Sequence, residues 1–363
     1  PGLYSKPHVS AGKTPPPDWA DQPPPAGMDA THNAAPSADQ SMNAFSPTFA
    51  DEELLREPTG SSIYEPDHVV GESGRRYHGY KEGSYLLPND EAEQDRLDFQ
   101  HAMMTLILGG KLAMAPIVET PKRVMDVATG TGIWALEFAR ANPGSYVVGT
   151  DLSKIQPEPE VPNCHFEKDD CEEDWLWDPT FDYIHIRQIV TGIRDPKRLF
   201  QQSYDHLKPG GWLEIQDGTM ELDGEGSHMR KWFDYCAAGA TAKGFDVRKA
   251  KNYSDWLKDI GCRCYILPSL PSALPPFQHG KGNGHLVTEI QAHRFEVPCS
   301  PWSRNAQAAR IGAYQQRNMH DGLRGVSYLL LRNAGLSPEQ IEEFVQATKV
   351  ELREGKVKGY SYL

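Results

Sequence analysis

The sequence predicts an α/β fold, with a mostly parallel sheet that carries helices on both faces. Short apolar segments alternate with helical patterns between residues 121 and 220. A glycine-rich turn follows the first of these apolar segments, where the pattern changes from strand to helix. Strands that alternate with helices form parallel sheets, and the helices then cover both faces of the sheet.

Four regions follow from this pattern. Residues 121–220 form the core of the sheet, and residues 71–120 precede it as N-terminal cap helices. Residues 221–363 contain the rest of the core and a mainly helical insertion that acts as a lid. Residues 1–70 hold two proline runs and few large apolar residues, so we expect a disordered tail, because burial cannot offset its ordering entropy. The proline runs either stay solvated or dock on an aromatic groove of a partner.

The first predicted helix begins at Asp90, after the segment Leu86–Pro88. Asp90 is the expected N-cap, and Glu93 is its expected capping-box partner. The helix ends at Gly109–Gly110, because glycine adopts the backbone conformation that closes a helix. Order in the chain is expected from about Arg75 onward.

The remaining elements follow from apolar periodicity and from turn residues. We expect strands at 123–128, 146–150, 164–166, 181–186 and 212–216, helices at 133–141 and 196–206, and turns at 142–144 and 208–211. Further on we expect helices at 253–260, 304–334 and 338–354 and strands at 262–267 and 357–363, whereas 274–298 shows no clear pattern.

Charge and composition narrow the class of protein. The formal net charge is −13, which argues against sequence-independent binding of nucleic acid, so no direct nucleic-acid partner is expected. No apolar run is long enough to span a membrane, and no secretory signal is visible. The six cysteines form no CxxC pair, which indicates reduced thiols in an intracellular protein, nuclear or cytoplasmic. The histidines show no metal-ligand spacing, so no metal is expected.

The most informative segment is the strand, glycine turn and helix that run from Val124 to Trp134. Glycine lets a ligand approach the backbone, and the start of the helix offers unpaired N–H groups. A dinucleotide fits the spacing of Gly130, Gly132 and Ala135. S-adenosylmethionine fits as well, and Asp126 favours it, because a carboxylate attracts the ammonium of that ligand and repels a pyrophosphate.

Two further carboxylates follow the next strands. Asp151 ends the second strand, where a carboxylate accepts hydrogen bonds from ribose hydroxyls in both kinds of site. After the third strand, Asp170, in preference to Asp169, is expected to accept a hydrogen bond from the adenine amino group. The alternative is that this acidic segment, which continues to Asp174, caps a helix or is solvated.

Four motifs in order and at the expected spacing resemble the class I S-adenosylmethionine-dependent methyltransferases: Asp126-Val-Ala-Thr-Gly-Thr-Gly-Ile-Trp, Gly149-Thr-Asp-Leu-Ser, Phe181-Asp-Tyr-Ile-His and Leu207-Lys-Pro-Gly-Gly-Trp. The finer pattern over residues 75–363, which includes Tyr85-Leu-Leu-Pro-Asn-Asp-Glu and Ser300-Pro-Trp, looks like the fungal LaeA-like group.

The resemblance implies a Rossmann-like core with S-adenosylmethionine as its cofactor. The residues that it assigns to the cofactor site are Asp126, Ala128, Thr129, Gly130, Gly132, Asp151, Leu152, Asp170, Cys171 and Tyr85. Ala128 departs from the pattern, because the family usually has the first glycine of its loop there, and the added methyl group is expected to weaken cofactor binding.

The resemblance also implies a function in fungal secondary metabolism. The methyl acceptor is then a small natural product or a protein. The alternative is a regulatory interaction protein with the same fold and little turnover, which works with a velvet-type protein. A nicotinamide enzyme is a third interpretation, supported by the G-x-G-x-x-A spacing alone.

Methyl transfer depends mainly on alignment of the acceptor, because the sulfonium is already activated. A general base helps only an acceptor that is protonated. At the carboxyl ends of the strands, His185 is a candidate base, or alternatively a packed core histidine, and Arg187 is a candidate for orienting an anionic acceptor. Others at these strand ends or over the cofactor are Gln216, Asp217, Tyr77 and Tyr85. Side chains that line an acceptor pocket in the lid, or alternatively pack in the core, are Met229, Trp232, Phe233 and Tyr235.

Overall fold

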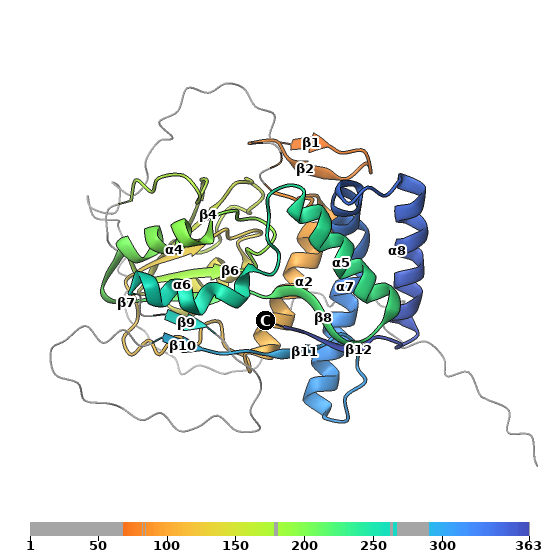
Figure 1. Ribbon diagram of the computed structural model, residues 1–363. Helices are drawn as coiled ribbons and strands as arrows, with labels where there is room; N and C mark the ends of the chain where they lie inside the picture. Colours follow the sequence, from red (N-terminus) through yellow and green to blue (C-terminus); the bar gives the residue numbers. More distant parts are fainter. Residues whose placement is uncertain are drawn as a thin grey trace, which may run out of the picture. The chain divides into compact units, whose positions relative to one another are not determined.

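The computed structural model describes residues 68–81, 83, 85–177, 181–261, 264–266 and 290–362 (Figure 1). The predicted disordered tail therefore lies outside the described residues, except for its last three positions, which form a strand. Much of the segment 274–298, for which the sequence gave no clear pattern, also lies outside them. Within the described part, no helix has the length and apolar character needed to cross a membrane.

A seven-stranded parallel sheet forms the core. Its strands are β3 (Arg123–Val127), β4 (Tyr146–Asp151), β5 (Cys164–Lys168), β6 (Phe181–Arg187), β7 (Leu207–Gln216), β9 (Cys264–Ile266) and β10 (Ile290–Ala292), in the order β10-β9-β7-β6-β3-β4-β5. Every pairing in this sheet is parallel, so all carboxyl ends lie at one edge. The strand order reverses between β3 and β6, and ligands bind at such a switch point in open α/β sheets.

Helices cover both faces of this sheet, which confirms the predicted fold class. Side chains of a strand alternate between the faces. Val124 points to the face covered by α2 (Glu91–Ile107) and α3 (Ile133–Ala141), and packs with Trp134 and Phe138. Met125 and Val127 point to the opposite face, where α4 (Pro196–Asp205) and α6 (Tyr253–Ile260) supply Phe200 and Leu257.

A second group of elements packs beside the sheet. Three antiparallel strands, in the order β11-β12-β8, comprise β8 (Thr219–Glu225), β11 (Glu296–Pro298) and β12 (Lys358–Tyr362). Three helices, α5 (Ser227–Thr241), α7 (Ala306–Asn333) and α8 (Pro338–Arg353), share an apolar cluster that includes Trp232, Leu330 and Val345. Figure 1 shows these helices lying along one another on the side away from α4 and α6.

Several expectations need correction. Several cap helices were expected in 71–120, but the described part of this region holds one helix, α2. It also holds β2 (Arg76–His78), which forms a hairpin with β1 (His68–Val70), just before the region. Asp90 is the N-cap of α2 and accepts a hydrogen bond from the Glu93 N–H at 3.2 Å, as predicted. The Glu93 carboxylate, however, does not complete the capping box, because it binds the Arg96 guanidinium.

The predicted turn at 208–211 lies inside β7. Its register nevertheless leaves residues 208–211 without partners on β6, because Phe181 pairs with Leu207 and Tyr183 pairs with Trp212. Residues 208–211 therefore bulge out of the ladder where the turn was expected, with Gly210 at φ 87°.

Candidate functional site

A cavity of about 120 Å³ lies at the switch point of the sheet. Its walls come from the loop after β3, from the ends of β4 and β6, and from the segment after β5. One face of α2 and the segment around Tyr85 complete it. Of the residues that the sequence assigned to the cofactor, those on this wall are Tyr85, Ala128, Thr129, Gly130, Asp151, Leu152, Asp170 and Cys171. The predicted site residues therefore largely meet in one place.

The glycines of the loop permit close packing. Gly130 and Gly132 have φ values of 60° and 80°, in the left-handed region that favours glycine. A Cβ at Gly132 would lie 2.4 Å from the ring of Phe166. Gly132 is also the N-cap of α3 and does not lie on the cavity wall, so its role is to bring β5 and the start of the helix together.

Ala128 lies on the cavity wall with a φ of 55°. An L-residue with a side chain pays about 1–2 kcal/mol for this left-handed conformation. The loop therefore holds a left-handed conformation at Ala128 at a cost in conformational strain. The sequence marked Ala128 as a departure from the family's pattern, and the structure shows that this residue has a strained backbone conformation.

Asp126 does not line the cavity. Its carboxylate is 2% exposed, accepts a hydrogen bond from the Thr129 hydroxyl at 2.5 Å and lies 2.7 Å from Nδ1 of His185. A direct contact with the cofactor is therefore not the arrangement in this structure. Asp126 instead holds Thr129, which does line the cavity, and so fixes the conformation of the loop.

His185 does not reach the cavity either, which corrects its candidacy as a general base. It is fully buried, and its ring stacks on Trp134 with centroids 3.7 Å apart. Its Nδ1 faces Asp126, and its Nε2 has no hydrogen-bond partner among the described residues. The structure supports the alternative that the sequence allowed, a packed core histidine.

Asp151 is the carboxylate best placed to contact a ligand. Its two oxygens accept hydrogen bonds from the backbone N–H groups of Gly130, at 2.9 Å, and Ser153, at 2.8 Å. These bonds fix the carboxylate at the end of β4, on the cavity wall. Burial raises the pKa of Asp151 to about 6, because the charged form is poorly solvated there.

Asp170 and Asp169 both lie on the cavity wall. The Asp170 carboxylate accepts a hydrogen bond from Lys81 Nζ at 2.7 Å, so its charge is balanced from the N-terminal side of the site. The pKa of Asp169 is raised, mainly by burial. The choice of Asp170 as the partner of the adenine amino group stays a prediction.

Arg187 lies on the cavity wall at the end of β6. Its guanidinium lies 3.0 Å from Nδ1 of His101, and Nε2 of His101 lies 2.9 Å from the Glu137 carboxylate. Burial lowers the pKa of Arg187. This chain of contacts holds a cation in the site, which keeps Arg187 as a candidate for orienting an anion.

The sequence did not predict several wall residues. Gln188 has a φ of 56°, and its Nε2 is buried with no hydrogen-bond partner among the described residues. Strained residues cluster at ligand sites. Leu97 and Gln100 enter from α2, and their spacing of three on one helix face was the available signal. Others on the wall are Asn89, Ser153, Ile155, Ile189 and Gly192.

The remaining candidates lie elsewhere. Tyr77 pairs within the hairpin of β1 and β2 and is not on the cavity wall. Gln216 and Asp217 line a second cavity, at the end of β7. Four side chains assigned to the lid line neither cavity: Met229, Trp232 and Phe233 are buried among α5, α7 and α8, and Tyr235 is partly exposed beside Phe344. The alternative of packing in the core therefore describes the first three better, whereas the exposed Tyr235 fits neither interpretation.

The fold and this cavity define an α/β domain that binds a nucleoside-containing ligand at its switch point. A family model described as a methyltransferase domain matches residues 99–265. "Methyltransferase pytC" of Aspergillus terreus is 34% identical over 74% of this chain and 78% of its own length. "Secondary metabolism regulator laeA" of Aspergillus fumigatus is 38% identical over 80% of this chain and 74% of its own length. "Secondary metabolism regulator LAE1" of Cochliobolus heterostrophus is 30% identical over 80% of this chain and 91% of its own length.

The chain therefore belongs to the LaeA-like methyltransferases, which are class I enzymes that use S-adenosylmethionine. The residues of the cavity fit this cofactor. Asp151 is a fixed acceptor at the end of β4, and the buried Gln188 amide is a donor with no described partner. The nicotinamide interpretation, which rested on glycine spacing alone, is set aside by the family.

Proposed function

We propose that this methyltransferase acts in fungal secondary metabolism and methylates a small natural product or a protein. The observation that carries the proposal is the Asp151 carboxylate, fixed by two backbone N–H groups on the wall of the switch-point cavity. The names of the relatives support the link to secondary metabolism. A protein acceptor is supported by one further relative, the "Protein-methionine methyltransferase laeA" of Emericella nidulans, 28% identical over 84% of this chain and 78% of its own length.

When bound, S-adenosylmethionine supplies an electrophilic methyl group on a sulfonium. The chain's own residues would hold and orient it. Asp151 would accept hydrogen bonds from the ribose hydroxyls, the loop from Ala128 to Gly130 would face the methionine end, and Asp170 would face the adenine. Arg187 would place a positive charge at the end of β6, where it attracts an anionic group. Because the methyl group is already activated, alignment supplies most of the rate enhancement.

Calorimetric titration with S-adenosylmethionine tests the cofactor site. The wild-type protein should bind it, and Asp151→Asn should weaken binding by about tenfold or more, because a charge-assisted hydrogen bond is replaced by a neutral one. Asp255→Asn, an exposed carboxylate on α6, is the matched control and should bind like wild type. Absence of binding by the wild type would contradict the proposal.

The second candidate is a regulator of secondary metabolism with little turnover, which works with a velvet-type protein. The strained Ala128 in the cofactor loop favours it, together with the relatives named as regulators. Transfer of a labelled methyl group from S-adenosylmethionine separates the two. A labelled small molecule or protein supports the enzyme, whereas cofactor binding without any labelled product, and co-purification with a velvet-type protein, support the regulator.

A nuclear or cytoplasmic, reducing location goes with either function. Four cysteines are buried and free, namely Cys164, Cys171, Cys236 and Cys299. Buried thiols without disulfides are common in reducing compartments. Fluorescence microscopy of a tagged chain in a fungal host tests the location, and a signal confined to the secretory pathway would contradict it.

A further inference from the structure

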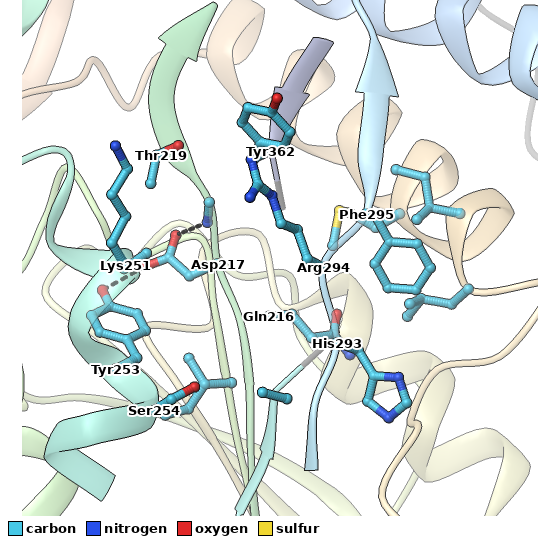
Figure 2. A pocket seen from close by; sticks show the side chains of 17 residues that line it. Gln216, Asp217, Thr219, Lys251, Tyr253, Ser254, His293, Arg294, Phe295 and Tyr362 are labelled. Atoms are coloured by element: carbon cyan, nitrogen blue, oxygen red, sulfur yellow. Dashed lines mark hydrogen bonds between the residues drawn. The ribbon is translucent and has the colours of Figure 1, made fainter. Parts of the chain in front are cut away.

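A second cavity, of about 400 Å³, lies at the carboxyl end of β7 (Figure 2). Five parts of the chain enclose it: the end of β7 and the residues after it (215–219), the start of α6 (250–254), the segment 292–295, the end of α2 and Tyr362 of β12. Its volume is in the range of small-molecule sites. No residue of the cofactor cavity is shared with it.

The two cavities are neighbours. Leu97 and Gln100 on α2 line the first, and Met104, Ile107 and Leu108, on the same face one to three turns further on, line the second. Residues spaced by three or four lie on one helix face, and each residue advances 1.5 Å along the axis.

The sheet gives the same result. Arg187 of the first cavity is the register partner of Gln216 of the second, on adjacent strands. Adjacent strands lie about 5 Å apart. The second cavity therefore abuts the cofactor cavity on the side of β7.

The walls of the second cavity combine apolar surface with two opposite charges. Side chains that supply the apolar surface are Met104, Ile107, Leu108, Ile215 and Phe295. The Asp217 carboxylate is held by the Tyr253 hydroxyl at 2.8 Å and by the Gly218 N–H at 2.9 Å. Burial raises the pKa of Asp217 to about 6. Figure 2 shows this group on one side of the cavity and the Arg294 side chain opposite it.

Arg294 and Lys251 are the cations that line the second cavity, and Lys251 Nζ donates to the Glu221 carboxylate at 2.7 Å. The guanidinium carbon of Arg294 lies 3.6 Å from the centroid of the Tyr362 ring, which fixes the plane of the group. No ion pair joins Arg294 to a carboxylate among the residues that the structure describes. A planar guanidinium that is held by stacking and has no acid partner among the described residues is suited to bind a carboxylate or enolate of a ligand.

We propose that this second cavity binds the methyl acceptor, and that the acceptor is a small organic anion with a ring system. The anionic group binds Arg294, the ring packs on the apolar wall, and a hydroxyl group donates to Asp217. This inference rests on the proposed function, because it identifies the substrate class of the same enzyme. A cavity of about 400 Å³, with Arg294 opposite Asp217 and an apolar wall, fits a compact amphipathic molecule better than a peptide.

Two fluorescent probes test the proposal: 1-hydroxy-2-naphthoate and 1-naphthol. Both carry a ring system and a hydroxyl group, and only the first carries a carboxylate. Both are titrated against the full chain saturated with S-adenosylhomocysteine. The naphthoate should bind about tenfold or more tightly than the naphthol, because a charge-assisted hydrogen bond distinguishes them.

Three variants locate the binding. Arg294→Gln should reduce naphthoate affinity by about tenfold and leave naphthol affinity within about twofold, because only the anion contact is lost. Arg310→Gln, an exposed arginine on α7, is the matched control and should change neither. Ser254→Phe, which fills the cavity from α6 without changing its charge, should abolish binding of both probes. Every variant is also titrated with S-adenosylmethionine and should keep wild-type cofactor affinity.

The outcomes are distinct. If the wild type fails to bind S-adenosylmethionine, the proposed function fails. If it binds the cofactor and neither probe, or if Arg294→Gln weakens both probes equally, or if Ser254→Phe leaves binding unchanged, the inference about this cavity is wrong. If labelled methyl groups are transferred from S-adenosylmethionine only to a protein and Ser254→Phe does not reduce this transfer, the acceptor is a polypeptide and the inference is also wrong.

Discussion

Ala128 occupies a left-handed backbone position where glycine would be unstrained. Ala128→Gly should therefore raise the free energy of unfolding by about 0.5–1 kcal/mol, since the relief of strain exceeds the added entropy of the unfolded chain. Urea unfolding measures this. Ala135→Gly, inside α3, is the control and should lower stability, because glycine is unfavourable in a helix. A loss of stability at both positions would show that the φ of Ala128 is not a source of strain.

The raised pKa of Asp151 predicts that cofactor affinity depends on pH. The pKa of this carboxyl is about 6 in the unliganded protein, and the charged form is the better acceptor for ribose hydroxyls. The affinity for S-adenosylmethionine should therefore be nearly constant above pH 7 and fall by about fivefold between pH 6 and pH 5, or about tenfold between pH 7 and pH 5. Calorimetry across this range measures it. Asp151→Asn should show weak binding without this step, and an identical step in that variant would assign it to another group.

At the scale of elements, the crossing of α5 and α7 depends on one glycine. A Cβ at Gly239 would lie 1.8 Å from the backbone oxygen of Leu330. Gly239→Ala should lower the free energy of unfolding by about 1–3 kcal/mol or more, because the helices must move apart. Gly144→Ala, whose nearest neighbour would be Lys122 Nζ at 4.0 Å, is the control. Equal stability of the two variants in thermal unfolding would mean that the helices separate without cost.

The start of α5 depends on a carboxylate from α8. Glu351 accepts hydrogen bonds from the backbone N–H groups of Ser227, His228 and Met229, at 2.8–3.0 Å. These bonds lower the pKa of Glu351 despite its partial burial. Glu351→Ala should cost about 1–3 kcal/mol, because N–H groups at the helix start lose their acceptor.

The exposed Glu343 on the same helix is the control for this change, and Glu343→Ala should cost almost nothing. Because the folded pKa of Glu351 is lowered, its contribution to stability is present at neutral pH and is lost as the pH falls below about 4. The difference between Glu351→Ala and wild type should therefore shrink in urea unfolding at pH 3. A difference that does not depend on pH would point to lost packing and not to the carboxylate.

How much the sequence could predict depends on the range of the interactions. The strands and helices of the parallel core follow local periodicity, and the loop from Ala128 to Gly132 was located by its glycines. The antiparallel sheet of β8, β11 and β12 pairs residues at least 62 positions apart, as Pro298 and Tyr360 are (360 minus 298), so no local pattern marks it. The direction in which a side chain points could not be predicted from the sequence either. The sequence placed Asp126 at the end of a strand, but it did not show that the carboxylate would face His185 and not the cavity.

The same reasoning explains the second cavity. The sequence placed Gln216 and Asp217 at the end of a strand, on the ligand side of the sheet. Arg294 lies in a segment without a clear pattern, and Tyr362 lies in β12, the second strand after it along the chain. Their proximity arises only when β12 pairs beside the sheet. Sites assembled from distant segments need the whole fold, whereas a site built on one strand and one turn does not.

At the scale of the whole molecule, the ligand edge of the sheet holds carboxyls that burial makes hard to ionise. The pKa values of Asp151 and Asp217 are raised to about 6 in the folded protein. A raised folded pKa means that the native state binds more protons, so the stability contributed is present below pH 4 and is lost as the pH rises through 6. The two carboxyls should therefore lower the free energy of unfolding of the unliganded protein by a few kcal/mol between pH 4 and pH 8. Each pKa unit of difference between the folded and unfolded states corresponds to about 1.4 kcal/mol.

Cofactor should reverse part of this loss. S-adenosylmethionine that binds charged Asp151 stabilises the folded state by about 2.7 kcal/mol at a hundredfold excess over its Kd, and this gain should be smaller at pH 5 than at pH 8. Urea unfolding at both pH values, with and without cofactor, measures the gain. Asp217→Asn should reduce the change in the free energy of unfolding between pH 4 and pH 8 and leave the stabilisation by cofactor unchanged. Asp151→Asn should reduce both quantities. If cofactor stabilises the wild type equally at both pH values, the ionised Asp151 is not what holds it.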